Sequence, residues 1–167
     1  MTLPLERFYS ENNDIRHLEL TNTYMDLANA INGKMTLWIP EIYGSTIAGT
    51  VTYGIQEGWY YRQGILTDLW FKVSWMAIGA ATGDLYIDLP FESKITINDD
   101  FWIGTASFSQ INLQTNYENL IFKVKSNSRI GYFEKLGSFV ASMPLAIPSS
   151  GTLGAHIRYY GIYTERA

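Results

Sequence analysis

Alternating apolar and polar positions dominate the middle of the chain, between residues 46 and 91. In the most regular run one side carries large apolar residues, namely Leu69, Phe71, Val73 and Trp75. The other side carries Trp70, Lys72, Ser74 and Met76. Successive Cβ atoms leave opposite faces of a pleated chain, so this period of two predicts a β-strand whose two sets of side chains lie on opposite faces.

A second alternating run follows directly, with Leu85, Ile87 and Leu89 expected to point inward. Asp84, Tyr86 and Asp88 are then expected to point outward. The segment GAATG at 79–83 separates the two runs and is long enough for a hairpin reversal. We therefore expect a central meander of antiparallel strands in which these two runs are neighbours.

Shorter runs rich in β-branched and aromatic residues predict the remaining strands. They lie at 50–56, 58–63, 94–97, 101–108, 111–113, 120–125, 129–136 and 155–163. The Pro-containing segment 138–154 is expected to be a surface loop. The last strand is aromatic on both faces, and because an end strand usually has one solvated face, this indicates burial against a partner. The pattern favours a mainly β fold, an antiparallel β-sandwich or jelly roll.

The beginning of the chain has a different pattern. Residues 1–13 show no period and predict an arm, and Asn13 or Asp14 can cap a short α-helix that ends at Gly33. The apolar stripe of this helix is Leu20, Tyr24, Leu27 and Ile31. So narrow a stripe suits packing on the chain's own sheet or association of several copies around an axis. We expect an arm and helix for attachment and trimerisation over 1–34 and a β-sandwich knob domain over 35–167.

The composition fits a folded single domain. The chain has 167 residues, of which 47% are apolar and 15% aromatic. Charged residues make up 17%, and the net charge of −4 leaves no basic patch, so nucleic-acid binding is not expected. No apolar run approaches the roughly 18 residues of a membrane span, and the first residues lack a signal-peptide pattern. We expect no membrane association.

The residues that usually carry chemistry are sparse. The absence of cysteine excludes disulfides and thiol catalysis. The two histidines, His17 and His156, belong to no metal or catalytic motif, and phosphate-binding loops and nucleophile elbows are absent. The adjacent Asp99 and Asp100 fit a polar turn better than a pair of catalytic carboxylates. We therefore expect no enzymatic activity, no metal site and no cofactor.

Exposed aromatic side chains are the stronger functional signal. Residues 59–61 are consecutive aromatics, so at least one of these rings must face outward, and the tyrosines at 159–160 repeat the pattern. Outward aromatic rings can anchor a subunit interface or stack on a sugar. The candidates for exposed aromatic or glycan contacts are Trp59, Tyr61 and Trp70.

Four segments between residues 38 and 91 follow the pattern W-x-P, G-x-Y-x-x-x-G, a long strand and T-G-x-L-x-I-x-L-P-F. They are 38–40, GWYYRQG at 58–64, the strand 69–75 and TGDLYIDLPF at 82–91. Together they resemble a recurring module in structural proteins of tailed bacteriophages. In that pattern Tyr60 would fill the core, Gly64 and Gly83 would permit turns, and Pro90 would end a strand.

The resemblance implies a jelly-roll-like knob on the outside of a virion assembled in the host cytoplasm, commonly a homotrimer and without catalytic residues. Its partners would be the major capsid protein or a fibre or tail component. Because only residues 1–34 precede the β domain, we expect a capsid decoration (cement) protein. The alternatives are a receptor-binding fibre or tail tip that contacts host surface glycans, and an ordinary soluble carbohydrate-binding module.

Two groups of residues follow from this expectation. The candidates for the trimer interface are Leu20, Tyr24, Leu27, Ile31, Tyr159 and Tyr160. The candidates for the attachment arm are Leu3, Leu5, Phe8 and Tyr9.

Overall fold

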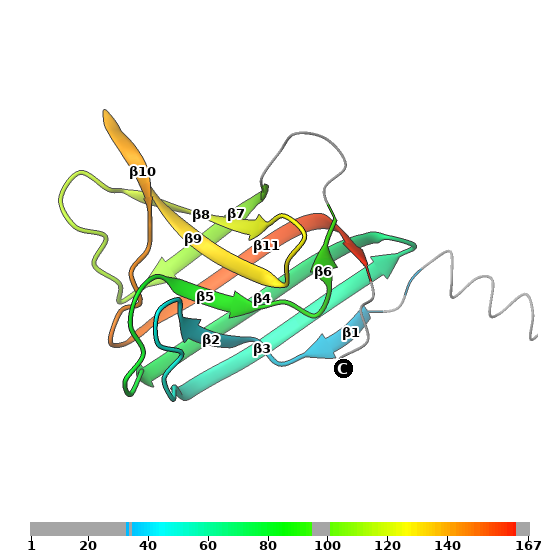
Figure 1. Cartoon of the computed structure of the whole chain (residues 1–167), viewed down its shortest axis with the longest axis horizontal. Helices are drawn as coiled ribbons and strands as arrows, with labels where there is room; N and C mark the ends of the chain where they lie inside the picture. Colours follow the sequence, from blue (N-terminus) through cyan, green and yellow to red (C-terminus); the bar gives the residue numbers. More distant parts are fainter. Residues whose placement is uncertain (1–32, 34, 95–100, 163–167) are drawn as a thin grey trace, which may run out of the picture. The chain divides into compact units, whose positions relative to one another are not determined.

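The computed structural model describes residues 33, 35–94 and 101–162 (Figure 1). The chain divides into two compact units, Met1–Lys34 and Met35–Ala167, and nearly all described residues belong to the second. The predicted arm and helix, with every candidate residue between Leu3 and Ile31, lie outside the described residues. No helix in the described part has the length and apolar character needed to cross a membrane.

The described residues form eleven β-strands and no α-helix. The strands are β1 (Met35–Trp38), β2 (Glu41–Gly44), β3 (Thr52–Gln63), β4 (Leu66–Ala77), β5 (Leu85–Asp88), β6 (Glu92–Ser93), β7 (Phe101–Ser109), β8 (Asn119–Lys125), β9 (Ile130–Gly137), β10 (Val140–Pro144) and β11 (Gly151–Ile162). Every pairing between them is antiparallel. The predicted mainly β, antiparallel fold is confirmed.

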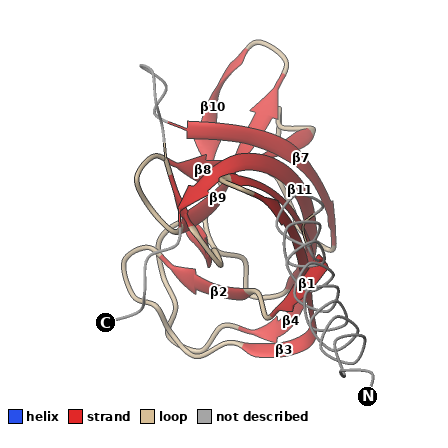
Figure 2. Ribbon diagram, turned by 90° about the vertical axis from the view of Figure 1, so that its right-hand side faces the viewer, coloured by secondary structure: helices blue, strands red, loops and turns tan. Residues whose placement is uncertain are grey.

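The strands build one sheet in the order β1-β3-β4-β11-β7-β8-β9-β5-β2. Figure 2 shows that this sheet is curled. β10 adds to β9, and β6 pairs with β11. The two ends of this order, β1 and β2, are joined by Ile39 and Pro40 alone. Two residues can link the ends only if the sheet bends round, so the curl follows from the connection. The expected sandwich or jelly roll is not confirmed.

The hydrophobic core fills the inner face of the curl. Phe71, Phe122 and Phe133 form its aromatic centre, with ring centroids 5.2 Å apart for Phe71 and Phe122 and 5.0 Å apart for Phe122 and Phe133. The first set of alternating residues on β4 and the inward positions predicted around β5 are all buried, namely Leu69, Phe71, Val73, Trp75, Leu85, Ile87 and Leu89. The two-sided alternation predicted for β4 and the inward side predicted for β5 are therefore confirmed.

The predicted meander is wrong where it joins β4 to β5. β4 pairs with β3 and β11, whereas β5 pairs with β2 and β9. The segment that connects β4 to β5 hydrogen-bonds to the loop after β2 instead. The amide of Thr82 donates to the carbonyl of Ile47 at 3.0 Å, and the amide of Thr46 donates to the carbonyl of Thr82 at 3.0 Å. β4 forms a hairpin with the preceding strand β3, and this hairpin turns at Gly64, whose φ is 59°.

Other segment boundaries differ from the sequence-based expectation. The runs at 50–56 and 58–63 form the single strand β3, with register shifts near Tyr53 that absorb the irregularity. Residues 111–113 are not a strand, and the expected loop 138–154 contains β10 and the start of β11. Most of the strand expected at 94–97 lies outside the described residues.

β11 is a central strand of the sheet and not the end strand that the sequence predicts. It is the last strand in sequence but lies in the middle of the sheet, between β4 and β7. Its inner side faces the core, where Leu153, Ile157 and Tyr159 are buried. The apolar inner side is explained by the fold of one chain and requires no partner.

Candidate functional site

The register of the sheet lines up five side chains in one row across its outer face. Leu37 on β1 pairs with Trp59 on β3, and Trp59 pairs with Trp70 on β4. Trp70 pairs with His156 on β11, which pairs with Thr105 on β7. Directly paired residues of antiparallel strands project from the same face, so these residues form a continuous outer row.

The alternation of each strand holds the outer row toward solvent. On β4 the neighbours of Trp70 are buried in the core, which forces the indole to the opposite side. Trp70 retains 37% exposure and Trp59 retains 42%. His156 is exposed because Ile157 beside it is buried. Burial of the neighbouring residues in the core therefore directs the side chains of the outer row toward solvent.

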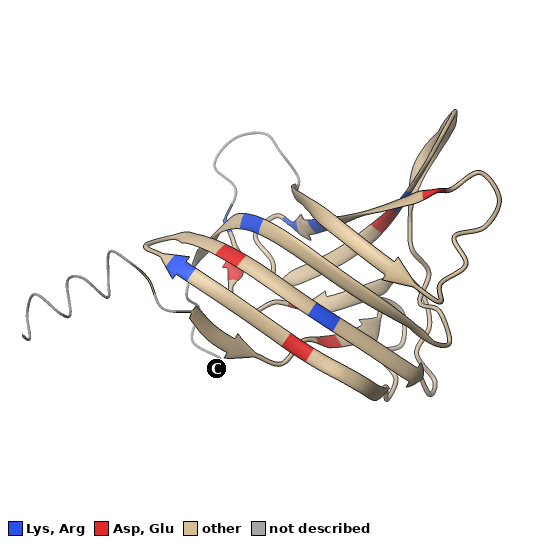
Figure 3. Ribbon diagram, turned by 180° about the vertical axis from the view of Figure 1, so that it is seen from behind, with Lys and Arg blue, Asp and Glu red and all other residues tan. Residues whose placement is uncertain are grey.

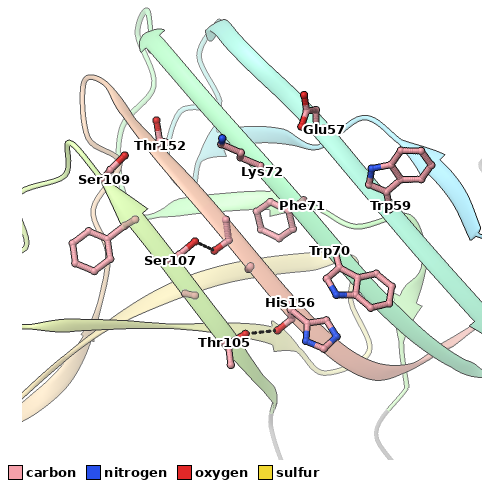
Figure 4. Close-up of a pocket in the computed structure, with 14 residues that line it drawn as sticks. Glu57, Trp59, Trp70, Phe71, Lys72, Thr105, Ser107, Ser109, Thr152 and His156 are labelled. Atoms are coloured by element: carbon pink, nitrogen blue, oxygen red, sulfur yellow. Dashed lines mark hydrogen bonds between the residues drawn. The ribbon is translucent and has the colours of Figure 1, made fainter.

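The rings of Trp70 and His156 stack on each other (Figure 4). Their centroids are 4.8 Å apart and their planes differ by 7°. Stacking of this kind restricts the rotation of both side chains. The exposed surface of Trp70 is therefore held in a defined orientation.

An ion pair lies next to the row, beside His156. Arg158 binds the carboxylate of Asp68 through two hydrogen bonds, of 2.8 and 2.7 Å. Nε2 of His156 lies 3.6 Å from Oδ1 of the same carboxylate. The hydrogen bonds to Asp68 raise the pKa of Arg158 above its ordinary value. The ion pair of Arg158 and Asp68 thus lies directly beside the stacked rings of His156 and Trp70.

A groove of about 610 Å³ lies along the row, over β3, β4, β11 and β7. Its polar lining is Glu57, Lys72, Thr105, Ser107, Ser109 and Thr152 (Figure 4). Gly154 lies between Lys72 and Ser107, and a Cβ at this position would come 2.8 Å from Oγ of Ser107. The glycine keeps the floor of the groove open.

A second row of aromatic side chains crosses the outer face elsewhere. Tyr43, Tyr86 and Tyr132 are paired in register on β2, β5 and β9. The ring centroids of Tyr43 and Tyr86 are 5.9 Å apart and those of Tyr86 and Tyr132 are 6.5 Å apart, each pair edge to face. Burial and the nearby Asp88 raise the pKa of Tyr43. These rings pack mainly on one another and are less suited to a ligand than Trp59 and Trp70.

The structure separates the predicted site residues into distinct groups. Trp59 and Trp70 are exposed and adjacent, whereas Tyr61 is half-buried and pairs with Asp68. Tyr160 is half-buried. Tyr159 is wrong as an interface candidate, because its ring is fully buried in the core of its own chain and its hydroxyl donates to the carbonyl of Phe91 at 3.3 Å.

The sequence alone did not predict a functional role for several residues of this site. His156, Gly154, Lys72 and Glu57 drew no functional prediction, although the alternation in AHIRYY places His156 on the face opposite Tyr159. No three His, Asp or Glu side chains within the described residues are close enough together to hold a metal ion. The groove offers side chains for hydrogen bonding and aromatic rings for stacking.

Comparison with known protein families, with curated proteins and with solved structures found no match to this chain. Its function must therefore be inferred from the outer face of the sheet.

Proposed function

We propose that this chain is a non-enzymatic structural protein of a bacteriophage particle, a capsid decoration protein that assembles as a homotrimer. The observation that carries the proposal is the uncovered apolar surface at the β1 edge of the sheet. Together with the phage-like segments between residues 38 and 91, that surface supports an assembly role.

The edge strand β1 and the link after it present apolar side chains to solvent. Met35 is 56% exposed, Leu37 is 64% exposed and Ile39 is 69% exposed. Among the described strands β1 pairs only with β3, so it forms one end of the described sheet. Apolar side chains that are exposed at such an edge favour association with another chain.

The apolar surface continues from β1 onto β3. Leu37 is paired with Trp59 and Met35 with Tyr61, so these four side chains share the outer face. Covering apolar surface contributes about 25 cal/mol per Å². A sister copy or a capsid protein that covers Met35, Leu37 and Ile39, which do not line the groove, would gain stability from it.

The test is the oligomeric state measured by light scattering. We expect the wild-type chain to have three times the chain mass of 19.0 kDa and Leu37→Lys to shift toward the single-chain mass. Ile65→Lys is a matched control, because Ile65 is 59% exposed but lies in the turn between β3 and β4. A wild-type monomer at all concentrations, with far-UV circular dichroism typical of a β fold, would overturn the trimer.

The position in the particle is a separate test. Mass spectrometry of purified virions from the source phage should find the chain in copy numbers comparable with those of the major capsid protein. A second candidate, a receptor-binding fibre or tail tip, is supported by the aromatic and hydroxyl side chains of the groove. A low copy number, matching that of tail proteins, would favour this second candidate.

A further inference from the structure

We propose that the groove over β3, β4, β11 and β7 binds a neutral oligosaccharide, with sugar rings resting on Trp70 and Trp59. This proposal goes beyond the assembly role and does not depend on it, because the groove is formed by one chain.

The size and floor of the groove suit a small ligand. Its volume of about 610 Å³ lies within the range of roughly 300 to 1,000 Å³ that is usual for ligand pockets. The absence of a side chain at Gly154 lets a ligand approach the backbone between Lys72 and Ser107. A larger residue there would fill the middle of the groove.

The aromatic side of the groove is organised before any ligand arrives. Trp70 is stacked on His156, which lies beside the Asp68 carboxylate that Arg158 holds. Trp59 is paired with Trp70 on the neighbouring strand and adds a second exposed indole. Side chains that are already ordered lose little conformational entropy on binding. Flat exposed rings offer the apolar surface on which the C–H face of a sugar can rest.

The polar side of the groove matches a sugar's hydroxyl groups. Hydroxyls of Thr105, Ser107, Ser109 and Thr152 line it, and each can donate and accept hydrogen bonds. The two ionic side chains, Glu57 and Lys72, have opposite charge and are paired across β3 and β4. Acidic and basic positions are scattered one by one over this side of the sheet (Figure 3). This balance favours a neutral ligand over a phosphorylated or sialylated one.

The place of the groove in the sheet argues against an extended peptide. A peptide that adds a strand needs a free sheet edge. β4 and residues 152–156 of β11, which form the middle of the groove, are paired on both sides, so their backbone groups are already used. A ligand in the middle of the groove must be recognised by side chains, as an oligosaccharide would be.

The experiment is a glycan array with the full chain, followed by titration of the best neutral ligand while tryptophan fluorescence is recorded. The array carries neutral oligosaccharides together with sialylated and phosphorylated glycans. We expect binding to a subset of the neutral ones. Trp70→Ala should weaken it about tenfold or more by removing the platform.

Gly154→Val tests the groove without touching an aromatic ring. Val is favoured in strands. A Cβ at this position would approach Oγ of Ser107, which can rotate away, and the carbonyl oxygen of Phe71 at 3.3 Å, which requires a shift of a few tenths of an ångström, so the fold should survive. We expect a similar loss of binding. Phe139→Ala is the matched control, because Phe139 is a fully exposed aromatic side chain outside the groove, and it should bind like the wild type.

The outcomes separate this proposal from the assembly role. Absence of neutral glycan binding, binding of anionic glycans alone, or binding unchanged by both Trp70→Ala and Gly154→Val would overturn the saccharide site. None of these results bears on the mass of the assembly. Leu37→Lys should retain glycan binding, because Leu37 does not line the groove.

Discussion

Arg158 and Asp68 lie opposite each other on β11 and β4, 90 residues apart in sequence, and are joined by two parallel hydrogen bonds. The Arg158 side chain is 64% exposed, whereas that of Asp68 is only 8% exposed. The pair therefore joins an almost buried carboxylate to a guanidinium that reaches into solvent. This asymmetry determines which of the two residues the fold depends on more.

We predict that Arg158→Gln destabilises the protein more than Asp68→Asn. The first substitution leaves a nearly buried carboxylate without its main partner, whereas the second leaves an exposed guanidinium that water can solvate. The double variant should unfold at a higher temperature than Arg158→Gln alone. Thermal melts followed by circular dichroism measure all three, and a larger loss in Asp68→Asn would contradict this account.

The second prediction concerns Phe139, whose backbone conformation is unusual for a residue with a side chain. It has a φ of 65° in the two-residue turn between the paired Gly137 and Val140, and its ring is fully exposed. A left-handed conformation costs a residue with a Cβ about 1–2 kcal/mol, which glycine avoids. Phe139→Gly should raise the free energy of unfolding by about 0.5–1 kcal/mol, after subtraction of the additional conformational entropy that glycine loses on folding.

Urea unfolding measures this change. Ser138→Gly is the control, because Ser138 is not among the residues with positive φ and should gain nothing. If Phe139→Gly destabilised the protein, its ring would be contributing contacts in solution that outweigh the backbone strain.

The inner face of the sheet could be predicted from sequence because it depends on local alternation. A strand such as β4 must bury either its odd or its even residues, and Leu69, Phe71 and Val73 leave no ambiguity. The neighbours of a strand are decided by contacts between distant segments. Nothing in the residues around Gly83 indicates that Thr82 hydrogen-bonds to the loop after β2 rather than closing a hairpin with β4.

The candidate site was predictable to the same extent. Trp59 and Trp70 could be recognised as outward residues on their own strands. Their contact with His156 depends on β11 pairing with β4, a register between residues more than 80 positions apart in the sequence. The role of Gly154 is equally invisible before the strands beside it are known.

Gly131 leads to a prediction about the core. It lies on β9 between β8 and β5, and a Cβ there would overlap Cζ of Phe122 and come 2.7 Å from Cγ2 of Ile87. Gly131→Ala should lower the free energy of unfolding by about 1–3 kcal/mol through overpacking. Urea unfolding measures the loss.

A double variant identifies the cause of that loss. Combining Gly131→Ala with Phe122→Leu should cost less than the sum of the two single substitutions, because the smaller side chain makes room for the new methyl group. Gly54→Ala is the matched control, since its Cβ would meet only Oγ of Ser74, at 3.0 Å. Additive losses would show that overlap with Phe122 is not responsible.

Tyr159 makes the fold sensitive to alkaline pH. Its ring is fully buried, and this burial raises the pKa of the phenol well above its ordinary value. In the unfolded chain a tyrosine loses its proton near pH 10, whereas the folded protein retains it. The stabilising contribution is therefore complete below about pH 10 and is lost as pH rises above it.

We predict that the free energy of unfolding of the wild type falls above pH 10 by up to about 1.4 kcal/mol per pH unit for this one group. Tyr159→Phe should lose about 1 kcal/mol at pH 7, with the hydrogen bond to Phe91, but decline less steeply above pH 10. A smaller decline should remain, because burial also raises the pKa of Tyr43 and Tyr53. Phe133→Leu, a core change without an ionisable group, should lower stability equally at all pH values. Urea titrations between pH 8 and 11 compare the variants, and parallel profiles for the wild type and Tyr159→Phe would show that Tyr159 does not cause the alkaline loss.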